Sequence, residues 1–165
     1  MVILGIDPGI KHTGLCVLKD GKAVFATTVI PPQHGKVLVM EVLECLLPVL
    51  NAVITKYSPS VTVVEEVTWY GRARRAMLPL ALIAGAIAGT CIARRVDTYL
   101  LLAAMRNKTK RWPVKWTEHE RDAARLAYRL HEWLALPVEK RSDLHRRLVA
   151  ATPTSNTTSA RSAPS

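Results

Sequence analysis

The pattern of apolar and polar positions over the first 30 residues predicts three strands. Residues 2–7 are mostly apolar and β-branched, and the run ends at Pro8-Gly9, a strong turn signal. Two further apolar segments, residues 14–18 and 23–29, flank Asp20-Gly21, which is a good hairpin turn. Three antiparallel strands are therefore expected to open the fold.

The pattern then alternates between helical and strand segments. Residues 37–57 have apolar side chains at helical spacing, interrupted by Pro48, and residues 61–66 have the composition of a fourth strand. A helical connection implies a right-handed crossover, with strand four parallel to strand one. The later segments predicted are a helix over 76–93, a short strand over 96–99, a helix over 117–134 that is capped by Thr117 with Glu120 at its third position, and a last helix over 138–150.

The length and composition indicate one domain. A chain of 165 residues, of which 49% are hydrophobic, can bury a single core, and the predicted domain covers residues 1–151. Residues 152–165 are rich in Ser, Thr and Pro and are expected to be disordered.

Positive charge is concentrated in the middle of the chain. Residues 68–117 contain ten Lys or Arg and one acid, Asp97, so this window carries +9 of the formal +10. Such a concentration indicates a polyanion, because neutralising phosphates drives nucleic-acid binding. The alternatives are a solvated basic face or an anionic lipid surface; the lipid is disfavoured because the basic residues fall largely in predicted loops.

The cysteines and the apolar segments bear on location. Cys16, Cys45 and Cys91 are widely spaced, which supports neither a disulfide framework nor a zinc site and suits a reducing cytoplasm. The start of the chain has no signal-peptide pattern. Residues 76–93 are apolar enough to suggest a short membrane span, but Pro79 and arginines at both ends favour a buried or subunit-facing helix, and hence a dimer.

Acidic residues follow two of the predicted strands. Asp7 ends the first strand, and Glu65 and Glu66 end the fourth, so parallel pairing would bring these strand ends together. Because strands alternate faces, only one of the two glutamates can share a face with Asp7. His119 and Asp122 lie at i and i+3 on the helix that follows.

Two interpretations of these residues stay open at this point. The set could bind Mg²⁺ or Mn²⁺, which favour carboxylate ligands. Alternatively, Asp7 only caps its own turn, and His119 and Asp122 are ordinary first-turn residues of a helix.

The order and spacing of three motifs resemble those of the RuvC-type Holliday-junction resolvases. The motifs are Ile6-Asp7-Pro8-Gly9, Val63-Val64-Glu65-Glu66-Val67 and His119-Glu120-Arg121-Asp122-Ala123-Ala124. The resemblance implies a ribonuclease H-like fold: a mixed five-stranded sheet, three antiparallel strands followed by parallel strands, with helices on both faces. It also implies a homodimer, through the 76–93 helix, that resolves four-way DNA junctions by paired symmetric nicks.

The resemblance also assigns the site. The implied catalytic and metal-binding residues are Asp7, Glu65, His119 and Asp122, with two Mg²⁺ or Mn²⁺ ions per site and with Glu66 turned away. His119 is either a ligand or a general base.

Two loops that combine aromatic and basic residues, 68–75 and 107–116, are predicted to contact DNA. In the family, an aromatic of the first loop inserts near the junction centre; the alternative for Trp69 is a place in the core. The segment before the 117–134 helix is shorter than in bacterial relatives, which would suit a compact phage-type enzyme. The DNA-contacting residues expected are Trp69, Tyr70, Arg72, Arg74, Arg75, Lys108, Lys110, Arg111 and Lys115.

Other functions are weighed against this one. An actin-like or sugar-kinase domain also begins with a strand, an Asp and a glycine turn, but the chain has no second lobe. A non-catalytic DNA-binding protein would explain the charge but not the four ligand-type residues. A general branched-DNA or flap nuclease would keep the site and change the substrate.

Overall fold

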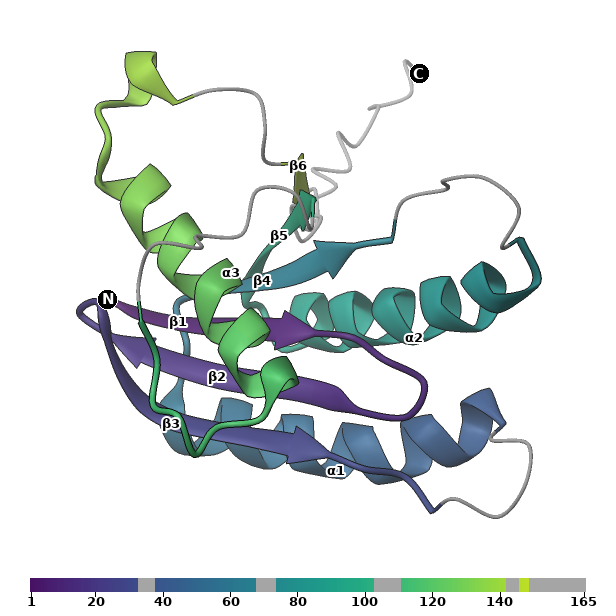
Figure 1. Cartoon of the computed structure of the whole chain (residues 1–165). Coiled ribbons are helices and arrows are strands. Elements are labelled where there is room, and N and C mark those ends of the chain that lie inside the picture. The colour runs from purple at the N-terminus through teal and green to yellow at the C-terminus, as the bar shows by residue number, and fades with distance from the viewer. Residues whose placement is uncertain (33–37, 68–73, 103–110, 142–145, 149–165) are drawn as a thin grey trace, which may run out of the picture.

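The protein folds around one mixed sheet (Figure 1). The computed structural model describes residues 1–32, 38–67, 74–102, 111–141 and 146–148. Sheet order is β3-β2-β1-β4-β5-β6, with β1 antiparallel to β2 and parallel to β4. The strands are β1 (Val2–Asp7), β2 (Thr13–Lys19), β3 (Lys22–Val29), β4 (Val61–Glu66), β5 (Asp97–Leu102) and β6 (Arg146–Leu148).

The hairpin between β2 and β3 turns at the predicted residues. Asp20 and Gly21 both have positive φ, 50° and 73°. A tight hairpin turn requires this conformation at both central positions, and the Asp-Gly pair tolerates it. The three antiparallel strands expected at the start of the fold are therefore confirmed.

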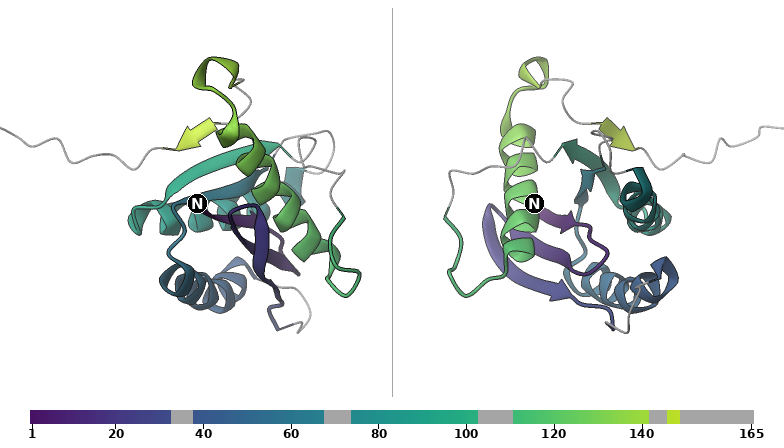
Figure 2. Two further views of the ribbon diagram at one scale, coloured as in Figure 1. Left: turned by 90° about the vertical axis from the view of Figure 1, so that its left-hand side faces the viewer. Right: turned by 45° about the vertical axis from the view of Figure 1, so that its right-hand side comes forward.

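Helices cover both faces of the sheet (Figure 2). α1 (Val39–Tyr57) and α2 (Arg74–Ala93) pack on one face, and α3 (Glu118–Ala135) packs on the other. Each face has its own cluster of buried apolar side chains. The ribonuclease H-like arrangement of strands and helices is as predicted.

The predicted interruption of α1 at Pro48 is wrong. The helix runs unbroken from Val39 to Tyr57. Proline inside a helix costs about 3 kcal/mol, but the neighbouring Leu46 and Leu50 are fully buried. Burial of a leucine contributes about 1.5–3 kcal/mol, so the two side chains offset the proline.

The last predicted helix, over residues 138–150, is also wrong. Val138–Lys140 forms a single 3₁₀ turn, and Arg146–Leu148 forms β6, antiparallel to β5. Val138 is 73% exposed, so the turn has no apolar face to bury. β6 instead gives backbone partners to the outer edge of β5.

None of the helices in the described ranges combines the length and hydrophobicity needed to span a bilayer. The predicted tail, residues 152–165, lies outside the described residues.

Candidate active site

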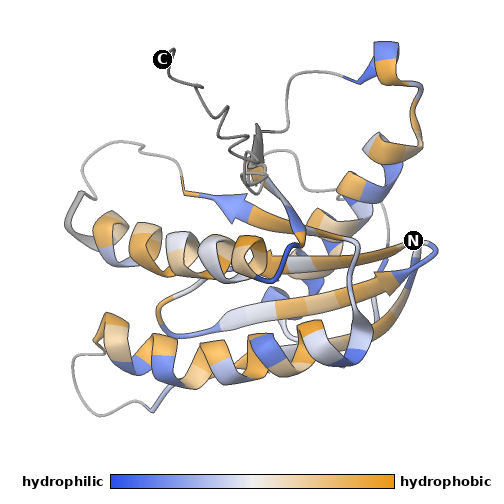
Figure 3. Ribbon diagram, turned by 180° about the vertical axis from the view of Figure 1, so that it is seen from behind, coloured by the Kyte–Doolittle hydropathy of each residue, from blue (hydrophilic) through white to orange (hydrophobic). Residues whose placement is uncertain are grey.

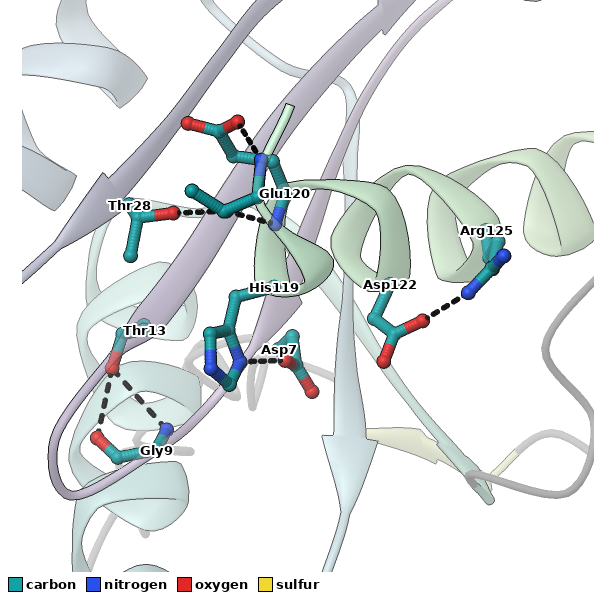
Figure 4. Close-up of polar contacts among 9 residues, drawn as sticks. Asp7, Gly9, Thr13, Thr28, His119, Glu120, Asp122 and Arg125 are labelled. Atoms are coloured by element: carbon teal, nitrogen blue, oxygen red, sulfur yellow. Dashed lines mark hydrogen bonds and ion pairs between the residues drawn. The ribbon is translucent and has the colours of Figure 1, made fainter. Parts of the chain in front are cut away.

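Asp7, at the carboxyl end of β1, contacts His119 of α3 (Figure 4). Nδ1 of His119 lies 2.9 Å from Oδ2 of Asp7, across 112 residues of sequence. The Asp7 side chain is 8% exposed and the His119 side chain is 37% exposed, so the pair lies where the core opens to solvent. The structure thus brings together two of the four predicted site residues.

A hydrogen-bonded cap fixes the start of α3. Thr117 is the N-cap, as predicted, and its hydroxyl accepts a bond from the backbone N–H of Glu120 at 3.1 Å. The Glu120 carboxylate accepts a bond from the Thr117 N–H at 2.8 Å. The Thr117 hydroxyl also lies 2.6 Å from that of Thr28 on β3. These bonds tie α3 to the sheet two residues before His119.

Two glycines let α3 lie directly on the strands beneath it. A Cβ atom on Gly5 of β1 would lie 2.1 Å from the carbonyl oxygen of Ala123, and one on Gly14 of β2 would lie 2.1 Å from that of His119. Gly14 is the sheet partner of Asp7. Only a residue without a side chain permits so close an approach, so the backbone of His119 sits next to Asp7.

The loop between β1 and β2 adds a second imidazole to the site. The Thr13 hydroxyl donates to the Gly9 carbonyl at 3.0 Å and accepts from the Gly9 N–H at 3.3 Å, which closes the loop. The rings of His12 and His119 are stacked, with centroids 5.2 Å apart and planes 14° apart. The sequence offered no signal for His12, because only the folded loop brings it to α3.

Asp122 lies one turn along α3 and is 8% exposed. Nη1 of Arg125 donates to Oδ1 of Asp122 at 2.7 Å (Figure 4). Arg125 was not predicted as a site residue, because an i, i+3 ion pair is an ordinary feature of helix surfaces.

Glu65 and Glu66 end β4, the strand parallel to β1 and adjacent to it. Val63 packs in the core cluster against α3, and Val64 packs in the cluster against α1 and α2. Because strand residues alternate faces, Glu65 lies on the α3 face with Asp7, and Glu66 lies on the opposite face.

Three carboxylates and one imidazole thus occupy one end of the sheet. This donor chemistry suits Mg²⁺ or Mn²⁺. Within the described parts of the chain, no three His, Cys, Asp or Glu side chains are close enough together to hold a metal ion. The convergence of Asp7, Glu65 and Asp122 on shared ions therefore stays a prediction.

Comparison with known proteins decides the family. The family model described as "Crossover junction endodeoxyribonuclease RuvC" matches residues 3–109, which is more than half of the chain. The chain belongs to the RuvC family. It is a crossover junction endodeoxyribonuclease, a nuclease that resolves four-way DNA junctions, and the predicted family, function and enzyme class are confirmed.

Solved structures of RuvC from Thermus thermophilus share the fold. One, in complex with a Holliday junction substrate, is 20% identical over 90% of this chain and 99% of that chain, with a TM-score of 0.71. Another is 21% identical over 90% of this chain and 100% of that chain, with a TM-score of 0.67. A comparison with curated protein sequences found no significant match to the chain. Identities this low support the fold and not the role of any residue.

The RuvC match contains Asp7 and Glu65 and ends before α3. The assignment of His119 and Asp122 therefore depends on their place in the structure, above all on the contact between His119 and Asp7.

The predicted RuvC-type DNA contacts are described in part. Arg111 and Lys115 are exposed. The tryptophan that follows each of them, Trp112 and Trp116, packs against the α3 core cluster, and the two rings stack with centroids 5.8 Å apart. Arg74 and Arg75 are the first residues of α2, and the structure describes only their backbone. The predicted contacts that lie outside the described residues are Trp69, Tyr70, Arg72, Lys108 and Lys110.

Proposed function

We propose that the junction is cut by phosphodiester hydrolysis at the Asp7–His119 site, with Asp7, Glu65, His119 and Asp122 as the active-site residues. The observation that carries the proposal is the 2.9 Å contact between Nδ1 of His119 and Oδ2 of Asp7. It joins groups that are 112 residues apart in sequence at the carboxyl edge of the sheet, where α/β folds hold ligands.

The carboxylates of Asp7, Glu65 and Asp122 would hold the divalent ions, Mg²⁺ or Mn²⁺, at two per site. Carboxylate oxygens are the ligands that these ions favour. When bound, the ions would lower the pKa of the attacking water and stabilise the leaving 3′ oxygen. The expected products carry a 5′ phosphate and a 3′ hydroxyl.

His119 would act on the attacking water or hold one of the ions. Its Nδ1 is directed at Asp7, so Nε2 is the ring nitrogen that can accept a proton from water or coordinate a metal. Asp7 and the stacked ring of His12 would keep the imidazole in one orientation.

Paired, symmetric nicks require two sites, and α2 offers a surface through which two copies of the chain would meet. Figure 3 shows α2 as hydrophobic or near-neutral along most of its visible length. Leu78 is 56% exposed and Leu82 is 53% exposed, while a Cβ atom on Gly85 or Gly89 would meet nothing within 4 Å. Exposed leucines beside glycines at i, i+4 spacing allow close helix packing across a two-fold axis.

The substrate would be held by basic side chains of the two aromatic and basic loops. Arg111 and Lys115, both exposed, are the described members of this set, and they would contact phosphates. The stacked indoles of Trp112 and Trp116 would give this loop a rigid base.

The decisive experiment compares cleavage of a four-way junction, a flap and a linear duplex in Mg²⁺, Mn²⁺ and EDTA. Symmetric paired nicks on the four-way substrate, lost in EDTA, are the expected result. Equal cleavage of the flap would instead indicate a general branched-DNA nuclease. The Asp7→Asn variant serves as the matched control, because it should bind the junction and fail to cut it. Cleavage at the normal rate by this variant would exclude the proposed site.

A further inference from the structure

Arg125 lies beside a proposed catalytic carboxylate, and the reaction described above does not use it. Its Nη1 is 2.7 Å from Oδ1 of Asp122, and its side chain is 29% exposed. The side chain is therefore partly open to solvent, one helical turn from Asp122.

The hydrogen-bonding capacity of Arg125 is incompletely used. A guanidinium carries five N–H donors in a planar fork. Within the described residues, its Nε atom is buried and has no hydrogen-bond partner. The pair with Asp122 uses the Nη1 group, so the partly exposed fork has donors left for an acceptor outside the protein.

Arg129, one turn further along α3, provides a contrast on the same helix. Its side chain is 41% exposed, and Nη1 lies 3.7 Å from Oε2 of Glu132. This is a loose pair between exposed side chains, of a kind that contributes little. The tight pair at Asp122 is therefore not a general property of arginines on α3.

We propose that Arg125 binds a backbone phosphate of the junction at the active site while it keeps its contact with Asp122. Arginine suits this position because its fork can donate to a carboxylate through one edge and to a phosphate through another. The bound phosphate would accept from an Nη group of Arg125, and Arg125 would orient the strand relative to Asp122. This inference rests on the proposed function, since it assumes that the strand to be cut lies against Asp122.

The test measures junction binding without cleavage. The affinity for a four-way junction is measured in EDTA over a range of salt concentrations. The proteins compared are the wild type, Arg125→Gln, Arg125→Lys and Arg129→Gln. Loss of one phosphate contact lowers the slope of log K against log salt by about 0.9. Arg125→Gln should show this smaller slope and roughly tenfold weaker binding at low salt. Arg125→Lys should restore the slope, and Arg129→Gln should match the wild type.

Three results would overturn the inference. In the first, Arg125→Gln has normal junction affinity and a normal salt dependence, and calorimetry without DNA shows tighter Mn²⁺ binding. Arg125 would then be only a counter-ion of the acidic site. Another is a lower melting temperature with an unchanged slope, which would make its role structural. The third is an equal effect of Arg129→Gln, which would indicate diffuse attraction. Because binding is read in EDTA, these outcomes are separate from a failure of the wild type to cut junctions.

Discussion

The hydroxyl groups of Thr28 and Thr117 lie 2.6 Å apart and join the edge strand β3 to the N-cap of α3. This bond connects two elements that are 89 residues apart in sequence. It lies two residues before His119, so the orientation of a proposed catalytic side chain depends on a helix cap.

Thr117→Ala should therefore affect both stability and activity. Loss of an N-cap hydroxyl costs about 0.5–2 kcal/mol, and the freed first turn would no longer hold His119 against Asp7. We expect a lower free energy of unfolding in urea, together with a fall in junction cleavage. Thr117→Ser keeps a hydroxyl at this position and should retain both properties. A normal cleavage rate in Thr117→Ala would show that the cap does not position His119.

Glu65→Gln and Glu66→Gln form a matched pair of variants, because the two side chains differ by one position along β4. Glu65 lies on the α3 face with Asp7, and the neutral amide of Gln is a poorer ligand for Mg²⁺ than a carboxylate. Cleavage should fall by at least about a hundredfold in Glu65→Gln and stay near the wild-type rate in Glu66→Gln. Single-turnover cleavage of a four-way junction measures both. The opposite ranking would mean that the acid facing α2 serves the reaction.

Gly5→Ala should destabilise the protein. The new methyl group would lie 2.1 Å from the Ala123 carbonyl oxygen and 2.8 Å from Cβ of Ala127, so α3 must move. Such overpacking costs about 1–3 kcal/mol. Gly85→Ala is the control, since its methyl group would meet nothing within 4 Å and alanine stabilises a helix interior by about 0.5–1 kcal/mol. Denaturant unfolding at low protein concentration should give opposite signs for the two variants.

Leu82→Glu should convert the proposed dimer to monomers. Leu82 is 53% exposed on α2, so a charge there leaves the monomer fold intact and opposes pairing of two helices. Sedimentation equilibrium measures the change. Val24→Glu, at a valine of 49% exposure on β3, should remain dimeric. A wild type that is monomeric throughout would exclude pairing through α2.

Alkaline pH should destabilise the fold through two buried thiols. Burial, assisted by the Glu120 carboxylate, raises the pKa of Cys16 to about 12. Burial also raises the pKa of Cys91 to about 11. The unfolded thiols ionise near pH 8.5, so the stabilisation is fully present below that value. It is lost as the pH rises through the folded pKa values, at about 1.4 kcal/mol per pH unit for each thiol.

Urea unfolding between pH 8 and 11 measures how the free energy of unfolding falls with pH. The fall should be less steep in the Cys16→Ala variant. An independent check uses thiol reagents. Cys45 is half-buried and the other two cysteines are buried, so one thiol per native chain should react quickly at pH 8. Equal reaction rates for all three would contradict the assigned burial.

Much of the fold and part of the site could be predicted because they depend on local patterns. Asp20-Gly21 marks a hairpin wherever apolar segments flank it, and Thr117 with Glu120 forms a capping box in the structure as in the sequence. Alternation along β4 separates Glu65 from Glu66, and the core clusters place their neighbours on the expected faces.

The features that the sequence analysis missed depend on contacts between distant segments. Pro48 stays within α1 because the buried leucines on either side offset it. β6 is three residues long, too short to show alternation, and exists because β5 offers it an edge. His12 joins the site through a folded loop, and no spacing rule identifies its position. Arg125 is at i+3 from Asp122, but this spacing is too common on helix surfaces to mark a site.

The 112-residue separation of Asp7 and His119 has a consequence for synthesis on the ribosome. A nascent chain that has emerged only as far as β5 already carries Asp7, Glu65 and 10 of the 23 Lys and Arg residues, so its formal charge is already positive and it can attract nucleic acid. It lacks His119 and Asp122, because α3 follows β5 along the chain. Truncated products would therefore bind DNA without cutting it, and nuclease activity would begin only when α3 closes over the sheet.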